Sequence, residues 1–164
     1  MYTPDIYKNE NQEEIEKFLQ ENSFGILINQ TNGKLWATHI PLELTINSEG
    51  KAILEGHISK ENLQCNGFLE KNEILAVFSG PHSYISSSWY GKKNVSTWNY
   101  EAVQIRGKVK LMNDEELFQH LEKLTFKYEK TQKCPMLVEN MGDELVKKEM
   151  KGAFGIHIFP TEIY

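Results

Sequence analysis

The alternation of apolar and polar positions indicates that β-strands dominate this chain. The clearest case runs from Trp36 to Ile46, where each even position carries an apolar residue or threonine. Strict alternation of this kind predicts a strand with one face packed on a core. Pro41 lies inside the run and lacks a backbone N–H, so we expect the strand pairing to be interrupted there, at an edge or a bulge.

Five further segments have the pattern or composition of strands, and tight turns join several of them. Asn32-Gly33 is typical of a two-residue hairpin turn, because both residues tolerate positive φ. Asn47-Ser48-Glu49-Gly50 predicts a second turn, after which the strand over 51–58 pairs back with even positions opposite even positions. The segment 74–78 is apolar on both faces, which predicts a central, buried strand. The five segments are 24–29, 51–58, 74–78, 98–112 and 153–159.

Helical periodicity and capping signals lie at the margins of these strands. Asn11 with Glu14, and Asn113 with Glu116, have the spacing of a capping pair. The helical segments are 11–22, 59–71, 113–128 and a short one over 143–151. No βαβ alternation appears, which excludes a Rossmann arrangement. We therefore predict a single domain over 1–164 of the mainly β (α+β) class, a six-stranded antiparallel β-barrel with two to three peripheral helices.

Composition and charge narrow the function classes. A net charge of −5 and a pI near 5.6 argue against a general nucleic-acid binder, which usually has a basic surface. No apolar run approaches the ~20 residues of a membrane helix, and the N-terminal residues lack the features of a signal peptide. Cys65 and Cys134 form no CxxC motif and are most simply free thiols. We expect a cytoplasmic protein that does not enter a membrane.

The familiar catalytic and metal-binding motifs are missing from the sequence. It contains no GxSxG, P-loop, GxGxxG or HExxH motif. Its histidines are not at zinc-site spacing with a cysteine, and no pair of adjacent short helices predicts a helix-turn-helix. The sequence therefore offers residues that bind a ligand rather than residues that act as acid, base or nucleophile.

The stretch from Gly80 to Tyr100 has the least ordinary composition. It holds two of the three tryptophans, three tyrosines, one histidine, two adjacent lysines and the run Ser86-Ser87-Ser88. We interpret it as a loop between two strands. One alternative is a surface loop that a few aromatic residues pin down. The other is a binding loop, in which aromatic planes stack on a ligand while hydroxyls and cations contact an anion.

Two groups of residues suit a phosphorylated aromatic ligand such as flavin mononucleotide (FMN) or a similar nucleotide. The phosphate candidates are Thr38, His39, Ser59, Lys60, Asn62 and Lys92 or Lys93. The ring candidates are Trp89, Tyr90, Trp98 and Tyr100. Ser59, Lys60 and Asn62 fall in the first turn of the predicted helix, where free N–H groups favour an anion. His39 and His57 share one strand face, which is either solvated or part of a ligand cleft, and tryptophans buried in a dimer interface would give the same pattern.

Several motifs resemble the PaiB-type family, described as FMN-binding negative transcriptional regulators. They are MYTP at 1–4, ATHIPL at 37–42, GHISKEN at 56–62, AVFSGPHSYISSSWY at 76–90 and VSTWNYEAV at 95–103. The resemblance implies a split β-barrel of the pyridoxamine-phosphate-oxidase-like type, a homodimer with FMN at the interface, and a regulator of the sporulation or protease-synthesis type. The ligand or interface residues that it implies are Thr38, His39, Pro41, His57, Lys60, Asn62, Ser88, Trp89, Tyr90, Thr97, Trp98, Asn99 and Tyr100.

Some positions depart from the family pattern, and other functions remain open. Lys60 stands where the family often has Arg, which keeps the charge but loses bidentate phosphate binding. Ser96 stands where Pro is common, and the sequence does not contain the family's Lys-rich tail. The alternatives are a flavin reductase or flavin-dependent oxidoreductase, and a haem-binding split barrel with a histidine ligand. The row Arg106, Lys108 and Lys110 is the only candidate DNA surface, and we expect no sequence-specific DNA binding at physiological salt.

Overall fold

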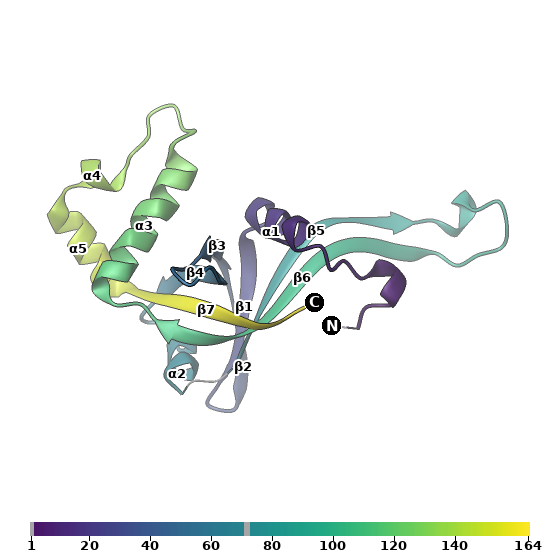
Figure 1. Ribbon diagram of the computed structural model, residues 1–164, viewed down its shortest axis with the longest axis horizontal. Helices are drawn as coiled ribbons and strands as arrows, with labels where there is room; N and C mark the ends of the chain where they lie inside the picture. The colour runs from purple at the N-terminus through teal and green to yellow at the C-terminus, as the bar shows by residue number, and fades with distance from the viewer. Residues whose placement is uncertain (1, 71–72) are drawn as a thin grey trace.

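The strands form one antiparallel sheet that curls into a barrel (Figure 1). The computed structural model describes residues 2–70 and 73–164. In the described part the sheet has seven strands, in the order β2-β1-β5-β6-β7-β4-β3. Their bounds are β1 Phe24–Thr31, β2 Lys34–Pro41, β3 Glu43–Ile46, β4 Ala52–Ser59, β5 Ile74–Ile85, β6 Thr97–Leu111 and β7 Ala153–Ile163.

The barrel closes at Leu42. β2 and β3 lie at opposite edges of the sheet, yet only Leu42 separates them in the chain. Leu42 is buried, and its N–H donates to the carbonyl oxygen of Ser23 at 2.8 Å instead of to a strand partner. The predicted interruption at Pro41 is therefore confirmed. The interruption divides the alternating run 36–46 into β2 and β3, which is why seven strands are present where six were predicted.

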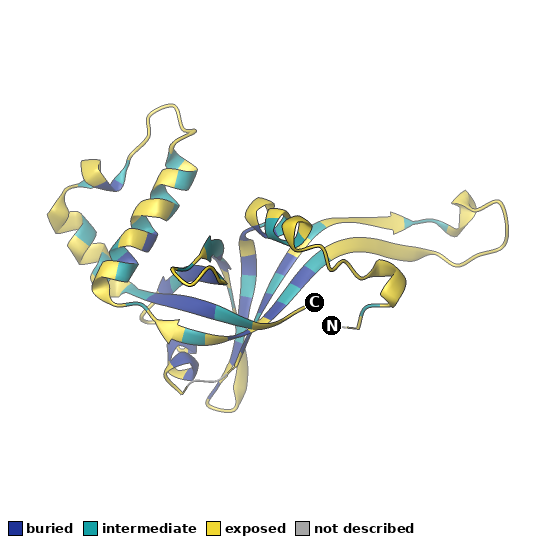
Figure 2. Ribbon diagram, in the orientation of Figure 1, coloured by how far each residue is buried: buried dark blue, intermediate teal, exposed yellow. Residues whose placement is uncertain are grey.

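The barrel interior holds the apolar side chains that the alternation predicted (Figure 2). β3 pairs with β4 so that Leu44 lies opposite Leu54, which confirms the even-to-even register. The Asn32-Gly33 turn is also confirmed, since both residues have positive φ, 52° and 72°. β7 continues past the predicted end at Pro160, which lies opposite Gly107 at a shift in register. The largest buried core residues include Leu27, Leu42, Leu54, Phe68, Phe78, Ile105, Ile156 and Ile158.

The described part has more helices than the two to three predicted. The five α-helices are α1 Gln12–Glu21, α2 Gln64–Leu69, α3 Asp114–Glu129, α4 Val138–Met141 and α5 Asp143–Gly152. The side chains of Asn11 and Asn113 cap α1 and α3 as the sequence indicated. Among the helices of the described residues, none is long and apolar enough to cross a membrane.

The helix predicted over 59–71 is much shorter than expected. α2 begins at Gln64, and Ser59 is still the last residue of β4. Ser59, Lys60 and Asn62 therefore do not form the first turn of a helix, and the anion seat expected from free N–H groups is not formed there. The predicted end at residue 71 lies outside the described residues.

The stretch from Gly80 to Tyr100 begins as strand, because β5 continues to Ile85, so the prediction of a loop from Gly80 was wrong there; residues 86–96 do form a loop between two strands. β5 and β6 remain paired from Ile74 opposite Gly107 to Ile85 opposite Thr97, with one irregularity between Ser79 and His82. Beyond it the two strands project from the barrel as an arm that no third strand covers (Figures 1 and 2). We call residues 82–100 the arm. Its tip contains the short 3-10 helix η2, Ser87–Trp89.

Candidate functional site

On the barrel, Thr38 and Asn62 meet as members of one polar network. The Thr38 hydroxyl accepts from Asn62 Nδ2 at 2.9 Å and donates to Gln64 Oε1 at 2.5 Å. Gln64 is fully buried and donates through Nε2 to the carbonyl oxygen of Leu27 at 2.9 Å. These bonds tie the connection between β4 and α2 to β1 and β2. Thr38 and Asn62 thus have a structural role in addition to their predicted role at a ligand.

Next to this network, Ser59 ends β4 and Lys60 follows it in a turn. The Ser59 hydroxyl accepts from the N–H of Glu61 at 3.2 Å, and the N–H of Lys60 donates to the carbonyl oxygen of Gly152 at 2.8 Å. The Lys60 side chain is exposed and forms no ion pair among the described residues. An unpaired cation beside a hydroxyl is suited to a phosphate group.

His39 and His57 have different surroundings. His39 is exposed, with its ring 6.3 Å from the ring of Phe24. Phe24 borders a hollow of about 410 Å³. His57 is half-buried, and its Nδ1 lies 3.1 Å from Nε2 of His120 on α3. The structure thus places His39 toward solvent and His57 beneath α3. Pro41 is the last residue of β2, at the break between β2 and β3. The hollow is lined by Gln20, Glu21, Asn22, Ser23, Phe24, Ser79, Lys127 and Tyr128.

The arm presents aromatic rings to solvent. Tyr84 lies opposite Trp98, with ring centroids 5.8 Å apart and nearly edge-on, and the His82 ring lies 6.2 Å from Trp98. Trp89 is 69% exposed, Trp98 59% and Tyr100 62%. Contiguous exposed apolar surface of this kind marks an interaction site more often than a solvated one.

Polar groups of the arm gather at its tip and along β6. The Ser88 N–H donates to the Ser86 hydroxyl at 3.2 Å, and the two hydroxyls are 2.8 Å apart. Tyr90 and the two lysines that follow it are exposed. Thr97 and Asn99 are also exposed, on β6. The tip therefore has hydroxyl donors and cations beside aromatic planes.

One chain does not bring the predicted site residues together. Figure 1 shows the arm pointing away from the barrel, so the residues of its tip are remote from β2 and β4. The barrel group is Thr38, His39, Pro41, His57, Ser59, Lys60 and Asn62. The arm group is Ser88, Trp89, Tyr90, Thr97, Trp98, Asn99 and Tyr100.

The chemistry of the two groups matches the parts of FMN. In the barrel group, the Lys60 ammonium and the Ser59 hydroxyl would hold the phosphate. In the arm group, Trp98 and Tyr100 offer planes for a flat ring, and the Asn99 amide offers both a donor and an acceptor for its polar edge. When bound, FMN would supply redox chemistry that no side chain of this protein has.

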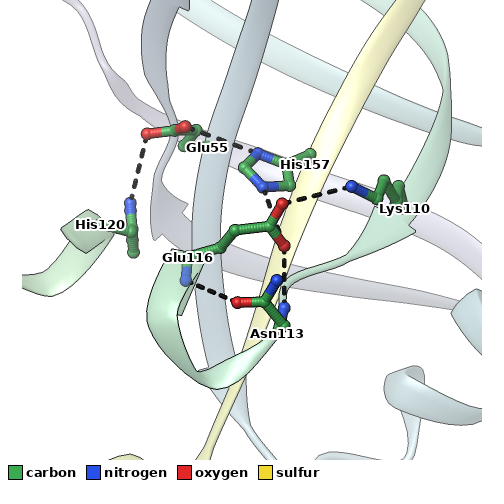
Figure 3. Close-up of polar contacts among 6 residues, drawn as sticks. All are labelled: Glu55, Lys110, Asn113, Glu116, His120 and His157. Atoms are coloured by element: carbon green, nitrogen blue, oxygen red, sulfur yellow. Dashed lines mark hydrogen bonds and ion pairs between the residues drawn. The ribbon is translucent and has the colours of Figure 1, made fainter. Parts of the chain in front are cut away.

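A polar cluster beneath α3 was not foreseen from the sequence (Figure 3). His120 lies outside the predicted apolar stripe of its helix, and the sequence favoured a solvated side chain. That prediction was wrong, because the His120 side chain is only 2% exposed. It faces Glu55 on β4, which also approaches His157 on β7. Among the described residues, no group of three or more His, Cys, Asp or Glu side chains is arranged to hold a metal ion.

Two of the three cations of the basic row on β6 have acidic neighbours. Arg106 lies 3.9 Å from Glu73 and 3.8 Å from Glu162. Lys110 lies 3.2 Å from Glu116. Paired cations of this kind have less charge available to neutralise DNA phosphates.

Fold and family are established by comparison with known proteins. The closed sheet with its projecting hairpin defines a split β-barrel of the pyridoxamine-phosphate-oxidase-like type. Residues 1–162 match the family described as "Putative FMN-binding domain", and the chain belongs to this family. The predicted fold class and family are thereby confirmed, and FMN is the cofactor for which the family is named.

Similar proteins include a curated relative and two solved structures. The chain is 40% identical over 163 residues to "Protease synthase and sporulation protein PAI 2" of Bacillus subtilis, covering 99% of this chain and 78% of that protein. A Listeria innocua structure described as "Putative Pyridoxamine 5'-phosphate oxidase" has a TM-score of 0.56 at 14% identity, covering 94% and 97% of the two chains. The flavocytochrome Anf3 of Azotobacter vinelandii has a TM-score of 0.68 at 15% identity, covering 99% and 70%. At these identities the two structures show the shared fold alone.

Proposed function

We propose that this chain is a homodimeric FMN-binding protein of the PaiB type, and that it acts as a negative transcriptional regulator. The observation that carries the proposal is the arm, where exposed aromatic residues are separated from the phosphate candidates of the same chain. In the proposed dimer, the arm of one chain lies beside the barrel group of its partner. Each FMN then contacts residues of both chains.

The energetics of the arm favour such an assembly. Burial of ~100 Å² on each exposed ring would stabilise a dimer by ~2.5 kcal/mol per ring. Several such rings occur on each arm. Their sum is large enough to offset the cost of association, which is about 4–15 kcal/mol.

The regulatory part of the proposal rests on the relative from Bacillus subtilis, whose name refers to protease synthesis and sporulation. We propose that this chain regulates transcription without contacting DNA itself. The net charge is −5, and Arg106 and Lys110 have acidic neighbours. An acidic surface with paired cations is better suited to repression through a partner protein, or through the flavin, than to repression by direct DNA binding.

Charge removal at Lys60 tests the FMN site. We expect Lys60→Gln to raise the Kd for FMN by about tenfold or more, because a charge-assisted bond to phosphate is lost. The measurement is titration of the apoprotein with FMN, followed by flavin fluorescence. Lys34→Gln is the matched control, since Lys34 is an exposed lysine at the far end of β2.

The FMN titration and two further assays separate the proposal from its alternatives. No FMN binding by the unmodified protein at micromolar concentration would overturn the proposal. Consumption of NAD(P)H by the FMN-loaded protein would instead favour a flavin reductase. A Soret shift on addition of haem would favour a haem-binding split barrel.

A charged residue on the arm tests the dimer. The unmodified protein is expected to have twice the 19.0 kDa chain mass in light scattering. We expect Trp98→Lys to weaken association by about a hundredfold, because the new ammonium would be desolvated in the interface. Leu35→Lys, at the exposed β1–β2 hairpin, is the control and should leave the mass unchanged. A monomeric unmodified protein would contradict the proposed dimer.

A further inference from the structure

An unusual pair of buried residues contributes to the attachment of α3 to the barrel, beside the bonds of Lys127 and Tyr128 to Glu43 at the other end of the helix. Only Leu117 and His120 are buried among the residues of this helix. Leu117 packs against β7, where a Cβ added at Gly155 would lie 3.0 Å from Leu117 Cδ1. His120 packs against β4 through its bond to His57. Of the two buried side chains of the helix, one is therefore titratable.

The bond between the two histidines requires a particular protonation state. His57 Nδ1 and His120 Nε2 are 3.1 Å apart, and the rings are inclined by 70°. One nitrogen must donate and the other must accept, because two N–H groups facing each other repel. The bond therefore persists only while at least one of the two facing nitrogens carries no proton.

Glu55 determines which of the two nitrogens is the acceptor. Its carboxylate lies 3.9 Å from His120 Nδ1 and 3.5 Å from His157 Nδ1 (Figure 3). A carboxylate favours a hydrogen on the nitrogen that faces it, and a neutral imidazole then has an acceptor at its other nitrogen. His120 thus holds its hydrogen on Nδ1 and accepts the Nδ1–H of His57 through Nε2.

Groups from four elements face this pair. β4 contributes Glu55 and His57, β6 contributes Lys110, β7 contributes His157, and α3 contributes Glu116, His120 and Lys123. Burial lowers the pKa of His120 to about 3, and the positive charges of His57, His157 and Lys123 add to this effect. Burial also lowers the pKa of His57. At the other end of the cluster, the Glu116 carboxylate lies 3.8 Å from His157 and 3.2 Å from Lys110, so it is paired with both of these basic side chains.

We propose that His57 and His120 form an acid-sensitive latch, which holds α3 on the outer face of β4 and β7 while neutral and releases the helix when both facing nitrogens are protonated. The latch shares His57 with the barrel group of the proposed FMN site, but its test on α3 requires neither FMN nor a second chain. Release exposes the strand face that carries Glu55 and His157.

The direction of the pH effect follows from the pKa of each ring in the docked helix compared with its pKa in the released helix. In the released helix both rings return to an ordinary pKa of about 6.5, whereas in the docked helix both pKa values are lower. The docked state therefore binds fewer protons. Docking is fully stable above about pH 6.5 and weakens as the pH falls from there toward 3, by about tenfold per pH unit for each proton taken up.

Hydrogen exchange of the full chain tests the latch. We expect the protection of the amides in 114–129, corrected for the intrinsic pH dependence of exchange, to fall by about 15-fold between pH 6.5 and pH 5 from proton uptake by His120 alone, and further with uptake by His57. The peptide 74–79 in the central strand should keep its protection over the same range. Parallel loss in both peptides would show global unfolding and would overturn the proposal.

Substitutions identify the groups responsible. His120→Gln retains an amide that bonds to His57 but does not titrate, so the pH dependence in 114–129 should fall to the smaller change that His57 alone produces. His57→Gln removes the other titrating ring from a half-buried position and should reduce the slope even if His120→Gln folds poorly. His82→Gln, on the exposed arm, should retain the full slope. An unchanged slope in His57→Gln and in folded His120→Gln would overturn the latch.

Discussion

Replacement of Phe78 by alanine is expected to lower the free energy of unfolding by about 3–5 kcal/mol, the usual cost of deleting a buried aromatic ring. Phe78 is 0% exposed and belongs to the central core. It lies on β5, opposite Val103 of β6, directly before the point where the hairpin leaves the barrel. Gly25 on the neighbouring strand is so close that a Cβ there would lie 3.0 Å from the Phe78 ring. Little space therefore remains for the surroundings to collapse into the cavity.

The matched control for this change is Phe24→Ala. Phe24 is also a phenylalanine of the sheet but is 66% exposed, so its replacement should cost about 1 kcal/mol or less. Urea denaturation followed by circular dichroism measures both values. A loss at Phe78 no larger than the loss at Phe24 would show that the barrel interior is not packed as described.

Most of the barrel could be predicted because its signals are local. Alternation along 36–46 identified a half-buried strand, and Pro41 marked its interruption. The positive φ of Asn32 and Gly33 suits the residue types at that turn. Each of these inferences needs only a few neighbouring residues: burial of one strand face, a missing N–H donor, or the φ that a residue type tolerates.

The arm could not be predicted in the same way. The residues around Tyr84 and Trp98 have good strand propensity, but they lack the alternation that burial of one face imposes. Both faces of the arm are exposed in a single chain. Its mixed composition therefore suggested a loop. Composition left open whether the stretch is a surface loop or a binding loop, and it did not indicate which backbone conformation the stretch adopts.

His120 shows a different reason for a missed residue. A helix stripe defined by apolar residues cannot include a polar side chain whose partners come from other elements. Glu55 and His157 lie opposite each other on β4 and β7, and only tertiary packing places them under α3. A signal was present nonetheless, since Glu55 and His57 lie on the strand face opposite Leu54 and Ile58. That face needed a covering element with polar side chains.

The candidate site is a third case. Thr38 and Asn62 are 24 residues apart in the chain and were both predicted, and the structure joins them by a hydrogen bond. The barrel and arm groups remain separate because their proposed meeting depends on a second chain. Sequence motifs identify such residues without locating them, since an interface and a ligand site select similar aromatic and polar side chains.

Gly67→Ala is expected to destabilise the protein although alanine is the better helix former. Within a helix, this change normally stabilises by about 1 kcal/mol. At Gly67, however, a Cβ would lie 2.5 Å from the carbonyl oxygen of Gln30 and 2.5 Å from Thr31 Oγ1. Because a β1 carbonyl oxygen is not the end of a flexible side chain, the helix itself must move. We expect overpacking to dominate, with a net loss of about 2–3 kcal/mol.

Gly152→Ala is the control that separates packing from helix propensity. Gly152 ends α5, and a Cβ there would meet no atom within 4 Å, so its replacement should be neutral or slightly stabilising. Thermal and urea unfolding of both variants give the comparison. Displacement of α2 at Gly67 would also disturb Gln64 and hence the Thr38–Asn62 bond, so FMN affinity should fall with stability. A Gly67→Ala protein as stable as Gly152→Ala would mean that α2 does not pack closely on β1, and the barrel half of the site would lose its supporting contact.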